Sequence, residues 1–208
     1  MVIVNDYLEV IEFDGTSLLR DIEKAGRTCY KSETNITNSS ASKFVRGVIK
    51  RGHEAVIEHG SISVRFVCDR GVSHELVRHR LTAVCQESTR YVNYKNSGLQ
   101  LIHPAELTPR QQKRRESFFI ACQELYMAEL DEGQPPQIAR GVLPTALKTE
   151  LVITANPREW RHIIKMRCDK AAHPQMRILM RQVWMKLEVM CPELFEDIVL
   201  FSDTDKGE

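Results

Sequence analysis

Apolar residues recur along the chain with two periods, one typical of helices and one typical of strands. Helical spacing predicts helices over about residues 17–29 and 40–50, the second ending before Gly52. Apolar and polar residues alternate over 62–69, which predicts a half-buried strand. Shorter apolar runs predict further strands over residues 1–4, 8–13 and 151–154.

Capping residues place the remaining helices. Ser, Thr or Asn at the cap position, or Pro in the first turn, marks each expected start, and Gly or Pro marks several of the ends. Ser73 is the expected cap of the first of these helices. The predicted helices cover about residues 73–81, 108–133, 135–143, 156–170 and 174–190.

The order of these elements favours an α+β fold with a small, mostly antiparallel sheet flanked by helices. Strands come early and once in the middle, so the strict alternation of a doubly wound sheet is missing. The 208 residues are enough to bury a core without disulfides or metals, and they contain no internal repeat. We therefore expect a single domain over residues 1–208.

Composition narrows the classes of protein. Apolar residues make up 42% and charged residues 27%, and no apolar run is long enough to span a membrane. The net charge of +1 gives no general attraction to nucleic acid or anionic lipid. Because the chain lacks a secretory signal and its scattered cysteines form no CxxC pair, we expect a cytoplasmic protein with free, mostly buried thiols.

Several common site motifs are missing. The glycines form neither the dinucleotide-binding GxGxxG motif nor the phosphate-binding GxxxxGK[ST] motif. Residues 53–59 begin like the zinc motif HExxH, but His53 and His59 are six positions apart instead of four. These histidines would point to different sides of a helix, so no metal site is expected.

The predicted helix over 73–81 has a polar face, and a second group of polar residues follows it. On a helical wheel Glu75, Arg78 and His79 share the face opposite Leu76 and Val77. The simplest interpretation is a solvated face with a Glu75–Arg78 pair. Residues 86–91 then add amide, hydroxyl, guanidinium and aromatic groups, which together suit a nucleotide.

The predicted helix over 156–170 carries a second basic group. Arg158, Arg161, His162 and Lys165 cluster on the wheel, while Arg167 falls among the apolar residues. A buried guanidinium needs an electron-rich partner. That partner is either an internal carboxylate, with Glu54 and Glu58 as candidates, or a substrate that becomes anionic during reaction.

These residues resemble the flavin-dependent thymidylate synthase family, whose signature is RHR-x2-S-x-N-x2-S-x-R. The match consists of Arg78–Arg80, Ser88 and Arg90, with Ala83 and Cys85 in place of the first Ser and the Asn. Glu75, Gln86 and His162 stand where some members carry Gln, Glu and Asn. Further matching blocks lie at residues 25–32, 52–59, 139–144, 154–162, 166–167 and 191–192.

The resemblance implies an enzyme of the flavin-dependent thymidylate synthase fold that makes dTMP from dUMP. The one-carbon donor would be 5,10-methylenetetrahydrofolate, the redox carrier FAD and the reductant NADPH. The resemblance further implies a homotetramer whose sites are shared between subunits. The net charge of +1, the aromatic content of 7% and the lack of a long apolar run argue against nucleic acid and membrane partners.

The resemblance also assigns residues. The expected dUMP-binding residues are Glu75, Leu76, Val77, Arg78, Gln86, Glu87, Ser88, Thr89, Arg90, Arg140 and Arg167. The expected FAD-binding residues are Ala55, Arg78, His79, Arg80, Gln86, Asn156, Pro157, Arg158 and His162, with His53 near the folate.

Arg167 is the expected catalytic residue. A fixed guanidinium beside uracil N3 and its neighbouring carbonyl would favour the N3-deprotonated ring and push electron density toward C5. Cys85 is not expected to act as a nucleophile, and Ser88 is expected to bind substrate. The alternative is a flavin-, nucleotide- or nucleic-acid-binding protein without synthase activity.

Overall fold

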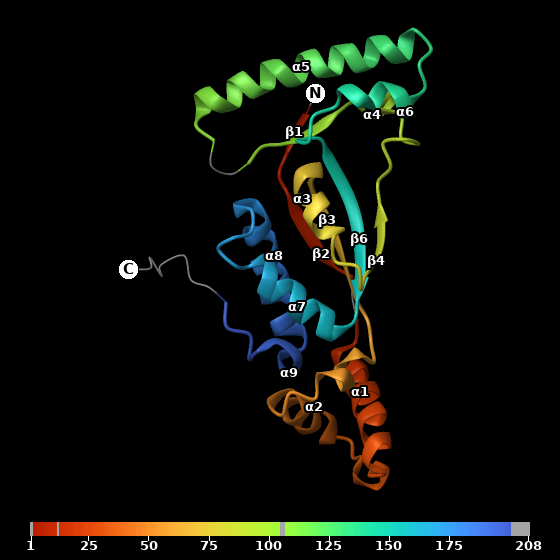
Figure 1. The fold of residues 1–208 in the computed structure, drawn as a ribbon, viewed down its shortest axis with the longest axis vertical. Coiled ribbons are helices and arrows are strands. Elements are labelled where there is room, and N and C mark those ends of the chain that lie inside the picture. Colours follow the sequence, from red (N-terminus) through yellow and green to blue (C-terminus); the bar gives the residue numbers. More distant parts are fainter. Residues whose placement is uncertain (1, 12, 105–106, 201–208) are drawn as a thin grey trace. The chain divides into compact units, whose positions relative to one another are not determined.

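The computed structural model of the chain describes residues 2–11, 13–104 and 107–200 (Figure 1). The strands are β1 (Val2–Val4), β2 (Tyr7–Val10), β3 (Ile62–Asp69), β4 (Ala83–Gln86), β5 (Gln100–Ile102) and β6 (Lys148–Ala155). The α-helices are α1 (Gly15–Tyr30), α2 (Ser40–Lys50), α3 (Arg70–Leu76), α4 (Tyr94–Ser97), α5 (Pro109–Asp131), α6 (Pro136–Ala139), α7 (Pro157–Arg167), α8 (Pro174–Met190) and α9 (Pro192–Phe195). The 3₁₀ helices are η1 (Glu33–Asn35), η2 (Glu54–Glu58) and η3 (Arg140–Val142).

The described strands form a four-stranded sheet of order β2-β3-β6-β4 and a two-stranded sheet of β1 and β5. β3 and β6 are antiparallel. The residue after β3, Arg70, donates its backbone N–H to Leu147 just before β6, whereas the Ser63 hydroxyl at the start of β3 bonds that of Thr154 near the end of β6. This mixture of helices and a small sheet confirms the α+β class predicted from the sequence.

The chain divides into two compact units. The first comprises Met1–Tyr7, Phe66–Arg78 and Cys85–Val152, and the second comprises Leu8–Arg65, His79–Val84 and Ile153–Glu208. The prediction of one domain over 1–208 stays a prediction.

In the first unit the long helix α5 packs against α6 and η3 (Figure 1). Phe119 and Tyr126 of α5 belong to a buried apolar cluster with Leu99, Leu101 and Leu147. β1 pairs in parallel with β5, with Ile3 opposite Leu101, so the same cluster also anchors this short sheet. The Thr108 hydroxyl accepts from the Gln111 N–H, which confirms the predicted start of α5.

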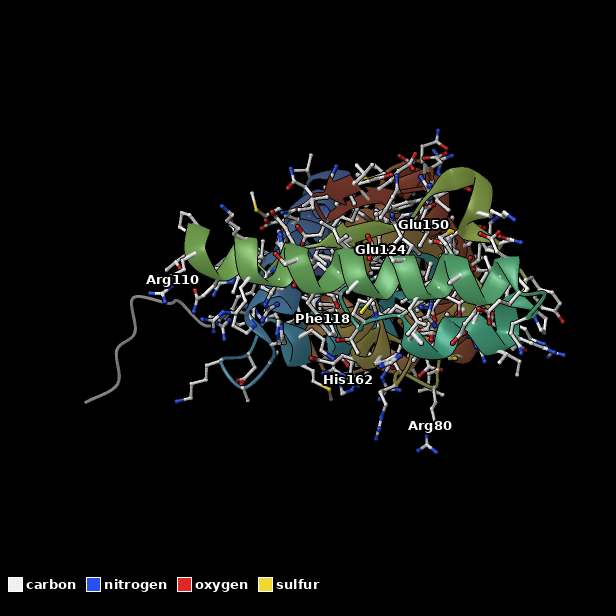
Figure 2. The ribbon with its side chains drawn as sticks, turned by 90° about the horizontal axis from the view of Figure 1, so that it is seen from above. Arg80, Arg110, Phe118, Glu124, Glu150 and His162 are labelled. Carbon is white, nitrogen blue, oxygen red and sulfur yellow. The ribbon has the colours of Figure 1, made fainter. Side chains whose placement is uncertain are left out.

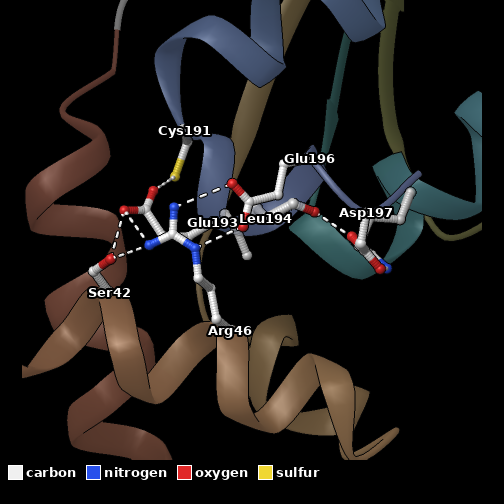
Figure 3. A network of polar contacts seen from close by, with 8 residues as sticks. Ser42, Arg46, Cys191, Glu193, Leu194, Glu196 and Asp197 are labelled. Atoms are coloured by element: carbon white, nitrogen blue, oxygen red, sulfur yellow. Dashed lines mark hydrogen bonds and ion pairs between the residues drawn. The ribbon is translucent and has the colours of Figure 1, made fainter. Parts of the chain in front are cut away.

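In the second unit α1 and α2 pack together beside η2, and α7 packs on α8, which packs on α9. The α1–α2 approach depends on Gly26, because a Cβ there would lie 2.5 Å from the Phe44 ring. Arg46 of α2 joins α9, since its Nε lies 2.6 Å from Glu196 Oε1 and its Nη1 lies 3.3 Å from Glu193 Oε1 (Figure 3). These contacts fix α2 on two sides.

Most predicted elements are present, and α8 has the predicted bounds. The helix expected over 73–81 is wrong: α3 runs from Arg70 to Leu76, because the Asp69 carboxylate accepts from the Val72 N–H and is the true cap. Ser73 lies inside the helix and donates to the Arg70 carbonyl. β4 was not predicted. Among the described helices, none has the length and apolar character that a membrane span requires.

Candidate active site

The Arg78–Arg80 segment follows α3 as a turn and not as part of a helix. Arg78 and His79 therefore do not share a helical face with Glu75, as the wheel predicted. Arg78 and Arg80 are exposed, and the Arg80 side chain extends away from the ribbon (Figure 2). His79 is the buried member of the three, with 7% of its surface exposed.

In the second unit His79 receives a hydrogen bond from Arg167, whose Nε donates to His79 Nε2 at 2.9 Å. His79 Nδ1 lies 3.8 Å from Glu159 Oε1, and the rings of His79 and His162 meet edge-on with centroids 6.1 Å apart. Burial, and then the neighbouring Arg167 and His162, lowers the pKa of His79 to about 4. A neutral His79 is therefore the acceptor that orients Arg167.

This arrangement identifies one electron-rich partner of Arg167, the ring nitrogen of His79. The guanidinium is half-buried at the end of α7, and its Nε side is held by His79. Glu54 and Glu58, the carboxylates proposed as its partners, instead lie near Arg158, with Glu58 Oε1 hydrogen-bonded to Arg158 Nη1 and Glu54 Oε2 3.7 Å from Arg158 Nε.

The ligand atoms of His79, Glu159 and His162 lie within 4.8 Å of one another, a spacing that a metal ion would also require. However, His79 Nε2 already accepts from Arg167, and the adjacent guanidinium would repel a cation. These contacts favour an organic ligand over a metal ion, and the absence of a metal site stays a prediction.

A cavity of about 630 Å³ opens beside α7 in the second unit. We call it the α7 cavity. Of the residues predicted to bind FAD, Asn156, Arg158 and His162 line it, whereas the others are not among its lining residues: Ala55, Arg78, His79, Arg80, Gln86 and Pro157. His53, predicted to lie near the folate, lines another cavity along α2. The α7 cavity is lined by Glu54, Glu58, Leu81, Asn156, Arg158, Glu159, Arg161, His162 and Lys165.

Six of these lining residues were not predicted as site residues: Glu54, Glu58, Leu81, Glu159, Arg161 and Lys165. Glu159 carries a usable signal, because it sits at the third position of α7 and its N–H donates to the Asn156 cap at 2.8 Å. Leu81 directly follows the RHR segment, whereas Glu58 reaches the cavity only through η2, a short element that the sequence did not predict.

Arg161 differs from the other basic residues of α7. The wheel grouped it with exposed Arg158 and His162, but only 3% of Arg161 is exposed. Its two terminal nitrogens lie 2.6 and 2.8 Å from the Asp197 carboxylate, and Nη1 also donates to the Leu194 carbonyl. The Arg161 hydrogen bond lowers the pKa of Asp197.

In the first unit Gln86 joins two elements. Its amide nitrogen donates to the Ser73 hydroxyl of α3 at 2.9 Å and to the Thr149 hydroxyl of β6 at 3.2 Å. The next residue, Glu87, donates its N–H to the Glu150 carbonyl at 2.8 Å, so the loop after β4 starts from a fixed position.

That loop carries several of the residues predicted to bind dUMP. Buried Thr89 accepts from Arg140 Nη1 at 3.2 Å, which joins two predicted residues that lie far apart in the sequence. The Arg90 Nε donates to Gln137 Oε1 at 3.1 Å, so a residue that was not predicted orients a predicted one. Leu76 is buried in the core, and its side chain therefore serves packing.

The predicted dUMP set is divided between the units. Arg167 belongs to the second unit, and the other ten residues belong to the first: Glu75, Leu76, Val77, Arg78, Gln86, Glu87, Ser88, Thr89, Arg90 and Arg140. The structure thus brings Thr89 and Arg140 together in one unit, and His79, Arg167 and His162 together in the other.

Two solved structures share this fold. A UMP/dUMP methylase, PolB from Streptomyces cacaoi, bound with 5-Br dUMP, matches with a TM-score of 0.78 at 20% identity, covering 94% of this chain and 96% of that chain. The same methylase bound with 5-Br UMP matches with a TM-score of 0.78 at 19% identity, covering 94% of this chain and 95% of that chain. The fold class is therefore that of this methylase.

The family follows from sequence comparison. The Thy1 family model, described as thymidylate synthase complementing protein, matches residues 13–193, and the chain belongs to this family. A flavin-dependent thymidylate synthase of Geobacter sulfurreducens is 32% identical over 83% of this chain and 78% of its own. The flavin-dependent thymidylate synthase of Mycobacterium tuberculosis strain H37Rv is 33% identical over 90% and 82%.

Proposed function

We propose that the protein is a flavin-dependent thymidylate synthase that converts dUMP to dTMP. Methylenetetrahydrofolate supplies the one-carbon unit, NADPH the electrons and FAD the redox carrier. The observation that carries the proposal is the family match over residues 13–193, within which the RHR segment, Ser88, Arg90, Arg140 and Arg167 are all intact.

The residues of the α7 cavity fit a flavin nucleotide. At about 630 Å³ the cavity has the size of a cofactor site. Lys165 offers a cationic donor for phosphate and Asn156 an amide, whereas Arg158 is already paired with Glu58. The buried Arg161 Nε has no hydrogen-bond partner among the described residues. Bound there, FAD would supply hydride chemistry.

In the first unit, two arginines are suited to bind the phosphate of a nucleoside monophosphate. Arg90 and Arg140 are exposed guanidinium groups, each oriented by a neutral partner, Gln137 and Thr89. Guanidinium groups held by neutral partners keep their charge for phosphate. We therefore assign the phosphate of dUMP to these two arginines.

Arg167 is proposed to activate the uracil ring. Its guanidinium would stabilise negative charge at N3 and the adjacent carbonyl oxygen, which raises the electron density at C5. Neutral His79 holds the Nε side of this group without adding a competing negative charge. No cysteine nucleophile is needed, and Cys85 is assigned no covalent role.

The proposed assembly is a homotetramer in the cytoplasm. Large apolar side chains are exposed on both units, such as Phe118 on α5 (Figure 2) and Val189 on α8, with 62% and 84% of their surfaces accessible. Subunit contacts would cover such groups. Light scattering of the purified protein tests the tetramer, and a monomeric mass would refute it.

An anaerobic turnover assay tests the activity. The purified protein should be yellow, and dTMP should form only when dUMP, methylenetetrahydrofolate and NADPH are all present. A colourless preparation that retains RNA would instead support a nucleic-acid-binding function. A flavoprotein that forms no dTMP under these conditions would support a binding protein without synthase activity.

A further inference from the structure

A second cavity of the second unit, of about 790 Å³, has no role in the function proposed above. It lies along α2 and contains residues of the segment 25–32, a block that resembles the family but to which the resemblance assigned no role. We call it the α2 pocket. Its lining residues are Arg27, Tyr30, Ser32, Ser39, Ser40, Lys43, Phe44, Gly47, Arg51 and His53.

The lining is cationic. Arg27, Lys43 and Arg51 face this pocket, and none of its described lining residues is a carboxylate. Arg27 is anchored from behind, since its Nε and Nη2 donate to buried Glu23 at 3.1 and 2.9 Å. Lys43 and Arg51 are exposed, which leaves their charges available to a solvated anion.

One face of α2 supplies most of the pocket. Ser40, Lys43, Phe44 and Gly47 follow helical spacing, and Arg51 is the residue after the helix. At the N-terminal end of α2 this face carries serines, and the first turn has no acidic residue. The helix dipole favours an anion at this end. At 1.5 Å per residue, its length from one end to the other is roughly 16 Å.

The pocket also has an aromatic part in a fixed position. The guanidinium of Arg27 lies 4.7 Å from the Phe44 ring centroid, and Phe44 packs tightly on Gly26. Tyr30 stands exposed at the same pocket. Gly47 leaves room for the Arg51 guanidinium, because a Cβ there would meet Arg51 Nη1 at 3.2 Å.

The α2 pocket neighbours the α7 cavity along the chain. His53 lines the α2 pocket, and Glu54, the next residue, lines the α7 cavity. A long ligand that reaches His53 along α2 therefore lies one residue, along the chain, from the lining of the cavity proposed to bind the flavin. An elongated ligand with an aromatic part and an acidic end fits the lining better than a small inorganic anion.

We infer that the α2 pocket is an anion site that binds the acidic end of one of the two co-substrates. This inference rests on the proposed function. The shared chemistry is a carboxylate or phosphate group attached to an aromatic molecule, and it has two sources: the glutamate tail of the folate or the 2′-phosphate of NADPH.

Direct binding tests the inference on the flavin-loaded protein. Calorimetric titrations compare folinic acid with its pentaglutamate form, and NADP⁺ with NAD⁺. In the wild type the more anionic member of one pair should bind at least about tenfold more tightly. In the Lys43→Glu/Arg51→Glu variant that preference should disappear. The pair that responds identifies the source.

The control is Lys50→Glu, which reverses one positive charge on an exposed residue of α2 outside the pocket, and it is compared with the single variant Lys43→Glu as well as with the double variant. It should keep the preference within about twofold, because solvent and salt screen its charge. Lys43→Gln/Arg51→Gln repeats the test if the charge reversal disturbs folding. Equal affinities within both pairs, or a preference that survives in the double variants, would overturn the inference.

The result is independent of turnover. Flavin content, dUMP binding and dTMP formation are measured on the same preparations. If the wild type forms no dTMP, the proposed function fails, yet the anion preference and its loss still decide the inference. If dTMP forms and neither pair responds, the inference fails and the proposed function stands.

Discussion

The two cavities of the second unit hold their positive charges differently. In the α7 cavity Arg158 and Arg161 are paired with carboxylates of the same unit. In the α2 pocket Lys43 and Arg51 are exposed, and no carboxylate is among the described lining residues. Paired cations fix a geometry, and exposed cations attract a charge from solution. We therefore expect the α7 cavity to orient its ligand and the α2 pocket to attract an anionic ligand from solution.

The largest expected effect comes from Arg167 at the end of α7. Arg167→Ala should lower turnover by about 100-fold or more and weaken dUMP binding, because it removes the group that stabilises negative charge on the ring. Flavin absorbance should remain. The measurement is single-turnover dTMP formation beside a flavin spectrum. Activity close to wild type would exclude the activation role.

Arg161 tests whether the cations of the α7 cavity are structural. Arg161→Ala should lower the free energy of unfolding by about 3 kcal/mol, since it removes a buried guanidinium from Asp197 and the Leu194 carbonyl. Arg158→Ala is the matched control: its side chain is half exposed, so the loss should stay below about 1 kcal/mol. Denaturant unfolding measures both, and equal losses would contradict the distinction between them.

His79 should make the free energy of unfolding depend on pH. Its pKa is about 4 when folded, against 6.5 for the free side chain. Above pH 6.5 both states are neutral, so this residue changes nothing there. As the pH falls from 6.5 to 4, only the unfolded state takes up the proton, and stability drops by up to about 3 kcal/mol.

The His79→Gln variant isolates this contribution. The free energy of unfolding is measured for both proteins at pH 7 and pH 5, and the wild type should lose more of it than the variant. Glutamine keeps an acceptor for Arg167, which limits other changes. Parallel losses in the two proteins would show that His79 does not titrate in this way.

The smallest effect is expected at Cys85, which is exposed on β4. Cys85→Ser should change turnover by less than about twofold, because the proposed chemistry uses no thiol nucleophile. The check is steady-state dTMP formation. Abolished turnover with flavin and dUMP still bound would mean that the cysteine is catalytic.

Local signals predicted much of the fold. The Thr108 cap and Pro174 placed α5 and α8 correctly, because a cap acts within one turn of its helix. The start of α3 was misplaced because Asp69 ends a strand and caps a helix at once. β4 was missed because its residues are mostly exposed, and its place in the sheet depends on pairing with distant β6.

The sequence also predicted part of the candidate site, but not its contacts between distant segments. The wheel correctly placed Arg158 and His162 on one surface. It could not show that Arg161 is buried, because its partner Asp197 lies beyond α8 and α9 in the sequence. The Thr89–Arg140 and Arg167–His79 hydrogen bonds likewise join distant segments, and no spacing rule reveals them.

The short element η2 begins directly after His53, which lines the α2 pocket, and its first and last residues, Glu54 and Glu58, line the α7 cavity. If a ligand in one cavity shifts η2, the other cavity changes shape with it. Binding at the two sites is then thermodynamically linked, and the linkage is reciprocal. The affinity that flavin gains from a ligand along α2 must equal the affinity that this ligand gains from flavin.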